Sequence, residues 1–136
     1  MTLINILPLV YVIGIFIIAI LLAKRGFFDS LRKNHYLFAF MAFIFPIIDI
    51  FQTHWALLYG KEGNPILLFI LSISEAFGWI SFVILHVAFS IASLILFWKG
   101  RSKNGSFSRF CVFLFGFIWA FPVFWNIIAM ATWGFF

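Results

Sequence analysis

The stretch YLFAFMAFIFPIIDIFQTHWALLY, residues 36–59, decides the fold of this chain. As a helix it is long enough to cross the roughly 30 Å of hydrocarbon in a bilayer. The same stretch carries Asp49, Gln52, Thr53 and His54 within an otherwise apolar run. The sequence therefore predicts a membrane-spanning helix that holds polar groups inside an apolar segment.

The composition of the whole chain places it in the same class. Of its 136 residues, 65% are hydrophobic and 10% are charged, and the mean hydropathy is +1.17. Soluble domains are about 45–50% apolar and about 25% charged, so a soluble fold is excluded. Long continuous apolar runs favour helices over a barrel, whose strands alternate. We expect an all-α polytopic membrane protein of one domain, with four transmembrane helices in an up-down bundle.

Four apolar segments divide the chain at about 3–23, 36–59, 65–98 and 110–133. The first lacks a basic region before it, so it is predicted to be a span and not a cleaved signal peptide. The third would make a helix of about 51 Å, well beyond the thickness of the hydrocarbon. It must tilt, bend or protrude, and Gly78 with its neighbouring serines is a suitable place for a bend.

The basic residues indicate the orientation. Eight of the nine fall in the two loops at 24–34 and 99–109. Because basic loops collect on the cytoplasmic side, both termini are predicted outside. The expected location is the plasma membrane of a prokaryote, as a multi-pass protein. Since this charge is explained by topology, the expected partner is the lipid bilayer and not nucleic acid.

A polar constellation surrounds the predicted turn after residue 59. With Glu62 as the middle of the turn, Asp49 and Glu75 lie equally far along two antiparallel helices and should share one depth. Asn126 in the last segment should lie at a similar level. Two facing carboxylates in a low dielectric do not both ionise readily, so they would share a proton or hold a cation. The predicted ligand- or ion-binding residues are Asp49, Gln52, Thr53, Ser72, Glu75 and Asn126.

A structural interpretation of the same residues stays open. A protonated Asp49 could hydrogen-bond Asn126 or Glu75 and hold helices together, at about 1 kcal/mol per bond. Counted back from Lys99, Glu75 could also lie at the outer interface in water.

Metal binding and catalysis receive little support. His54 and His86 are weak metal candidates, because their spacing from Asp49 and Glu75 does not form a shared ligand shell. His86 lies about 16 Å deeper than Glu75 along one helix. No nucleophile arrangement or phosphate-binding loop is present, so we expect no catalytic residue, metal or cofactor.

The hairpin resembles a family of small uncharacterised bacterial and archaeal four-helix membrane proteins. The resemblance rests on the pattern D-x3-T, then G, then E-x-N-P. In this chain the pattern is formed by Asp49, Thr53, Gly60, Glu62, Asn64 and Pro65. The resemblance implies membership of a membrane family and no particular activity.

Three functions remain open from the sequence. The favoured one is a non-catalytic subunit or interaction module of a larger membrane assembly or homo-oligomer, since 22 Phe residues could pack against other subunits as well as lipid. An ion- or proton-linked transporter or channel component using Asp49 and Glu75 is the alternative. A binding protein or enzyme for a lipid-soluble ligand is the third.

Overall fold

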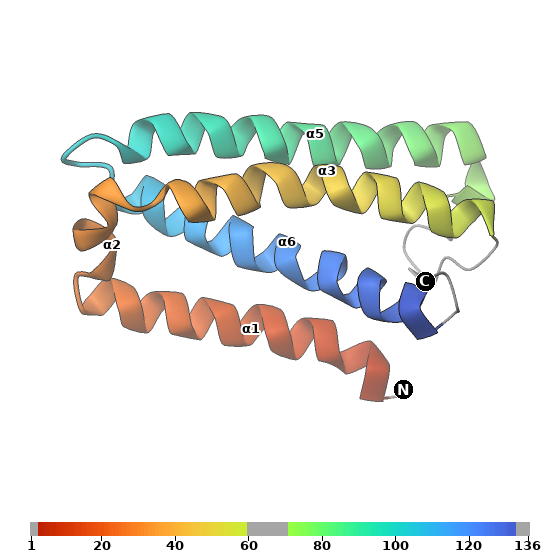
Figure 1. Cartoon of the computed structure of the whole chain (residues 1–136), viewed down its shortest axis with the longest axis horizontal. Helices are drawn as coiled ribbons and strands as arrows, with labels where there is room; N and C mark the ends of the chain where they lie inside the picture. The colour runs from red at the N-terminus through yellow and green to blue at the C-terminus, as the bar shows by residue number, and fades with distance from the viewer. Residues whose placement is uncertain (1–2, 60–70, 133–136) are drawn as a thin grey trace.

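The computed structural model describes residues 3–59 and 71–132, and these residues are helical with short connections. The long helices are α1 (Leu3–Lys24), α3 (Tyr36–Leu58), α5 (Glu75–Gly100) and α6 (Ser106–Thr132). The short helix α2 (Phe27–Ser30) and the 3₁₀ turn η1 (Leu31–Lys33) join α1 to α3. The long helices alternate in direction, so the start of α1 and the end of α6 lie at one end (Figure 1).

In the described part of the chain, α3, α5 and α6 are each long and apolar enough to cross a membrane. Residues 9–24 and 27–33 form a pair bent by 77°, which would make a fourth span if the two belong together. The expected all-helical class, with helices long and apolar enough to span a membrane, is therefore confirmed.

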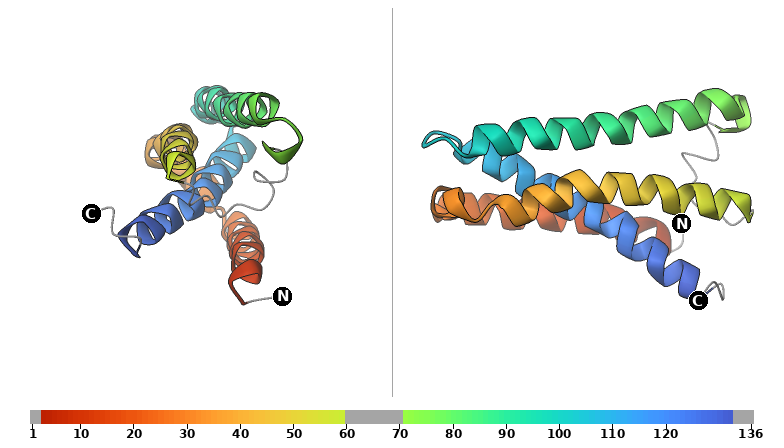
Figure 2. Two further views of the ribbon diagram at one scale, coloured as in Figure 1. Left: turned by 90° about the vertical axis from the view of Figure 1, so that its right-hand side faces the viewer. Right: turned by 45° about the horizontal axis from the view of Figure 1, so that its top comes forward.

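The helices do not form a square four-helix bundle. α6 contacts α3, α5 and α1, whereas α1 packs chiefly against α6 (Figures 1 and 2). α1 lies on the opposite side of α6 from α5 (Figure 2). The Tyr11 hydroxyl donates a 2.7 Å hydrogen bond to the Phe117 carbonyl oxygen and fixes this contact. The compact unit is thus α3, α5 and α6, with α1 added on one side.

Small side chains allow the three helices to approach closely. The buried positions of α3 recur at alternating intervals of three and four residues, which places them on one face. They are Ala39, Ala42, Pro46, Asp49, Thr53 and Ala56. On α6, a Cβ atom at Gly116 would lie 3.0 Å from the Phe38 carbonyl oxygen. Membrane helices associate through such small-residue faces, because lipid supplies no hydrophobic drive between them. Asp49 and Thr53 face inward because they belong to this packing face.

The third apolar segment is interrupted. Ser74 has an extended backbone, with φ −160° and ψ 114°, and its side chain caps α5 by accepting a 3.4 Å hydrogen bond from Phe77 N–H. Residues 71–73 are helical, the break falls at Ser74, and α5 begins at Glu75 with Gly78 within its first turns. Residues 60–70, which include the expected turn, lie outside the described residues.

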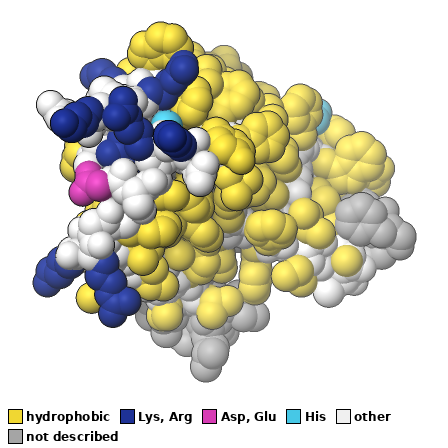
Figure 3. Space-filling model, turned by 60° about the vertical axis from the view of Figure 1, so that its left-hand side comes forward, with side chains coloured by type: hydrophobic (Ala, Val, Ile, Leu, Met, Phe, Trp, Pro, Cys, Tyr) yellow, Lys and Arg dark blue, Asp and Glu magenta, His cyan; other side chains and the backbone are white. Residues whose placement is uncertain are grey.

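One end of the molecule is basic. Lysine and arginine side chains gather there, around the turn α2–η1 and the loop after α5 (Figure 3). Arg109 is buried among them, and it donates hydrogen bonds to the carbonyl oxygens of Phe28, Gly100 (2.6 Å) and Ser102 (3.1 Å). This side chain holds α2 and the end of α5 against the start of α6.

Candidate functional site

A buried acid–base pair joins α3 to α5. His86 Nε2 lies 3.0 Å from Asp49 Oδ2, and His86 Nδ1 lies 2.7 Å from the Phe82 carbonyl oxygen. Only 6% of Asp49 and 3% of His86 is exposed. Asp49 is 13 residues into α3, roughly 20 Å from the basic end along the helix. The pair thus lies well inside an apolar segment, where ionisable groups are rare and usually functional.

The contacts of the two His86 ring nitrogens indicate where hydrogen can lie in this pair. A carbonyl oxygen only accepts, so His86 Nδ1 carries a hydrogen directed at Phe82. One further hydrogen must then lie between Nε2 and Asp49 Oδ2. It can belong to a neutral carboxyl group or to an imidazolium facing a carboxylate, and both forms have zero net charge. Without it, a carboxylate would face a nitrogen lone pair at 3.0 Å. The contact is therefore compatible with a neutral pair that holds one proton between Nε2 and Oδ2.

α6 completes the coordination of Asp49. Asn126 Nδ2 donates a 2.8 Å hydrogen bond to Asp49 Oδ1 and lies 3.5 Å from Gln52 Oε1. Gln52 Nε2 in turn donates to the Val123 carbonyl oxygen at 3.3 Å. Both carboxyl oxygens of Asp49 thus have partners. Asn126 and Gln52 are only half-buried, so they form the more accessible edge of this network.

Aromatic rings enclose the His86 side. The Phe82 ring centroid lies 3.9 Å from that of His86, and the Trp119 centroid lies 4.5 Å away. Phe89 packs against Trp119 at 5.5 Å. These rings lower the local dielectric, so an uncompensated charge there would be costly.

A second polar contact, nearer the basic end than the pair, sets the register between α3 and α5. Ser90 Oγ donates a 2.9 Å hydrogen bond to the Phe43 carbonyl oxygen. Ser90 is one turn beyond His86, and Phe43 is nearly two turns before Asp49. The pair is thus held by backbone contacts as well as by its own hydrogen bond.

The expected pairing of Asp49 with Glu75 is wrong. Glu75 is exposed in the first turn of α5, where a carboxylate complements the positive end of the helix dipole. It precedes His86 by 11 residues, about 16 Å along the helix axis. The expected common level assumed a turn centred on Glu62. The midpoint between Asp49 and His86 falls instead between residues 67 and 68.

The other predicted residues divide between the network and the surface. Thr53 is buried one turn after Asp49 on the same face, whereas Ser72 is exposed near the start of α5. The motif residues Gly60, Glu62, Asn64 and Pro65 lie outside the described residues. The structure thus brings Asp49, Gln52 and Asn126 together and leaves Ser72 and Glu75 apart from them.

The histidines do not share a site. His54 is exposed and packs against Trp79, with ring centroids 5.4 Å apart. In the described ranges, no three His, Cys, Asp or Glu side chains come close enough to hold a metal ion.

Sequence reasoning missed His86 as the partner of Asp49. The available signal was the series His86, Ser90 and Ser93, which places polar side chains on one face of a helix. Matching that face to the buried face of α3 would have moved the centre of the hairpin by about five residues.

The fold and this network define a membrane-type helical protein with a buried polar core. The family model described as a domain of unknown function, DUF5658, matches residues 40–132. The chain therefore belongs to this family, and the matched region contains the whole Asp49–His86–Asn126 network. No curated protein and no solved structure is significantly similar to the chain.

Proposed function

We propose that this protein is a small proton-linked component of a membrane, in which the Asp49–His86 pair binds and releases one proton. The observation that carries the proposal is the 3.0 Å contact between Asp49 Oδ2 and His86 Nε2, both buried within helices of membrane-spanning length. No metal, cofactor or covalent chemistry is needed for this function.

The change of charge supplies a mechanism. With the proton bound, the pair is neutral and joins α3 to α5. Release of the proton to water leaves one negative charge in a low dielectric, with the hydrogen bond across the two helices lost. The charged form favours entry of water or a cation from the more accessible Gln52 and Asn126 edge. Release of the proton is thereby coupled to the separation of α3 from α5.

Proton flux into liposomes tests this function. The purified protein is reconstituted with an internal pH-sensitive dye, and a potassium gradient with valinomycin sets the membrane potential. We expect wild-type protein to conduct protons and Asp49→Asn to abolish the flux, because an amide cannot exchange a proton in this range.

The matched control is Glu75→Gln. It removes one carboxylate that is exposed and lies about 16 Å from His86 along α5. It should keep wild-type flux. No flux in wild type at any pH, or equal flux in Asp49→Asn, would remove the proposal.

A second candidate is a subunit or interaction module of a larger membrane assembly or homo-oligomer. The observation that favours it is the position of α1, which packs chiefly against α6. Its exposed large side chains include Leu9, Ile13, Ile17 and Leu21, and these would contact either lipid or a further subunit. Native mass spectrometry from mild detergent tests it, and a monomer with no co-purified protein would count against it.

We also propose the orientation with both termini outside and the basic loops in the cytoplasm of a prokaryotic cell, which follows from the charge distribution. Cys111 is the chain's single cysteine, so a Cys111→Ser background allows single-cysteine labelling. A membrane-impermeant maleimide should label Thr132→Cys in intact cells and Lys103→Cys only after permeabilisation. The reverse pattern would overturn the orientation.

A further inference from the structure

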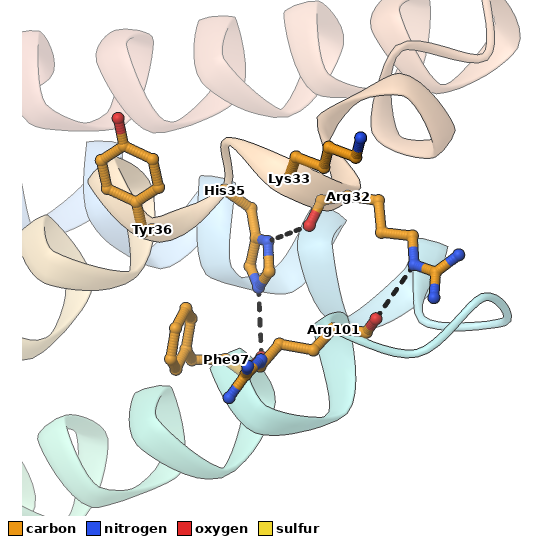
Figure 4. Close-up of a pocket in the computed structure, with 6 residues that line it drawn as sticks. All are labelled: Arg32, Lys33, His35, Tyr36, Phe97 and Arg101. Atoms are coloured by element: carbon orange, nitrogen blue, oxygen red, sulfur yellow. Dashed lines mark hydrogen bonds between the residues drawn. The ribbon is translucent and has the colours of Figure 1, made fainter.

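A second polar feature lies at the basic end, remote from Asp49. A cavity of about 690 Å³ is lined by Arg32, Lys33, His35, Tyr36, Phe97 and Arg101 (Figure 4). Its wall is formed by η1, the first residues of α3 and the last turn of α5. Because these are the ends of helices long enough to span a membrane, we expect the cavity to lie at the level of the lipid headgroups.

The charge around the cavity is positive. Three of its six lining residues are cations, namely Arg32, Lys33 and Arg101. Asp29, the one acidic residue of the two basic loops, is directed to Arg109, at 3.7 Å. The cavity therefore has cations without a carboxylate among its lining residues, which favours an anion.

Carbonyl oxygens at the end of α5 would ordinarily repel an anion, but they already have donors. His35 Nε2 lies 3.1 Å from the Phe97 carbonyl oxygen, and Arg32 Nε donates to the Arg101 carbonyl oxygen at 3.1 Å. His35 Nδ1 lies 3.0 Å from the Arg32 carbonyl oxygen. These bonds neutralise the negative end of the helix and fix the two segments that carry the cations.

Both ring nitrogens of His35 thus face oxygens that only accept. A neutral imidazole has one N–H and satisfies one of these contacts, whereas an imidazolium satisfies both. His35 is buried, and its two contacts hold η1 against the last turn of α5.

Two aromatic side chains flank the cavity in the manner of a membrane interface. Tyr36 lines it and is largely exposed, and the Arg101 guanidinium lies 5.0 Å from the ring centroid of the exposed Trp98. Tyrosine and tryptophan are enriched at the headgroup level, and basic pockets between membrane helices bind anionic headgroups.

We propose that this cavity binds the phosphate group of an anionic lipid headgroup, with Lys33 and Arg101 as its principal cations. The proposal is independent of proton binding at Asp49, since it rests on other residues, at the basic end of the molecule.

Lipid binding by the intact protein tests it. Native mass spectrometry in detergent would follow titration with phosphatidylglycerol, with phosphatidylcholine and with phosphatidylglycerol plus inorganic phosphate. The test variant is Lys33→Gln/Arg101→Gln, which leaves the hydrogen bonds named above intact because Arg101 takes part through its carbonyl oxygen. The control is Lys99→Gln/Lys103→Gln, which removes the same charge from exposed residues that do not line the cavity.

We expect wild type to prefer phosphatidylglycerol, and the test variant to lose at least about fivefold more affinity than the control. Competition by inorganic phosphate at millimolar concentration would assign the site to phosphate itself, and its absence would assign it to the whole lipid. Equal losses in both variants, or no preference for phosphatidylglycerol over phosphatidylcholine, would overturn the proposal.

Discussion

Ser93 Oγ donates a 3.1 Å hydrogen bond to the carbonyl oxygen of Ala42, on the neighbouring helix α3. That carbonyl is the one that Pro46 leaves without its usual helical partner, because proline has no N–H. Ser93 is fully buried, and its single hydroxyl hydrogen is shared between this oxygen and the Phe89 carbonyl oxygen at 2.8 Å. A side chain of α5 thus compensates for a proline in α3, as is required where no water is available.

Ser93→Ala should therefore destabilise the protein by about 1–2 kcal/mol. Unfolding in mixed micelles would measure the change. The matched experiment repeats it in a Pro46→Ala background, where residue 46 regains its N–H and satisfies Ala42 directly. There the cost should fall clearly, and an equal cost in both backgrounds would contradict this role of Ser93.

Substitutions of Asp49 should separate structure from proton exchange. An asparagine can still accept from Asn126 and donate to His86 Nε2, so Asp49→Asn should stay within about 1 kcal/mol of wild type. Asp49→Ala leaves His86 and Asn126 without their partner and should cost about 2–4 kcal/mol. The same unfolding assay measures both, and equal destabilisation would show that charge at Asp49 holds the fold.

The closest approach of α3 and α6 should be intolerant of larger side chains. Gly116→Leu places side-chain atoms where the Phe38 backbone lies, and backbone moves far less readily than a side chain. A loss of about 1–3 kcal/mol is expected. Gly14→Leu is the control, because a Cβ atom there meets nothing within 4 Å. Thermal melts that rank the two variants in the opposite order would contradict the packing.

Arg109 should stabilise the basic end through its hydrogen bonds and not through its ion pair. Arg109→Gln removes the side-chain donors to the carbonyl oxygens of Phe28 and Gly100 and should cost about 2–4 kcal/mol. Lysine should not restore stability, since it lacks the planar set of donors. Asp29 is 71% exposed at its side chain, so Asp29→Asn should cost under about 1 kcal/mol. A larger loss for Asp29→Asn than for Arg109→Gln would refute this assignment.

The fold class could be read from the sequence because hydrophobic length is a strong constraint. Apolar runs end at Lys24 and Lys99. Within such runs the helix satisfies the hydrogen bonds of the backbone without water. The packing of α1 could not be predicted. Its residues are apolar on all sides, so no polar–apolar pattern indicates which face contacts a neighbouring helix. The start of α5 at Glu75 depends on the cap formed by Ser74, and Ser72 is an equally good candidate in the sequence.

The site could be predicted in part. Asp49, Gln52 and Asn126 were identified because polar groups in apolar helices are costly and usually converge. The partner of Asp49 could not be identified, because helix levels depend on the length of the connection. A midpoint at 67.5 in place of 62 replaces Glu75 by His86 and changes a pair of acids into an acid and a base.

The central claim is that one proton is shared between Asp49 and His86 inside the helical core. The most direct test is nitrogen NMR of ¹⁵N-histidine-labelled protein in lipid discs, with the His86 signals assigned by His86→Gln and followed over pH. We predict that Asp49→Asn shifts the signals of both His86 ring nitrogens, because the proton between Nε2 and Oδ2 is lost with the carboxyl group. His86 signals that are the same in wild type and in Asp49→Asn at every pH would contradict the account.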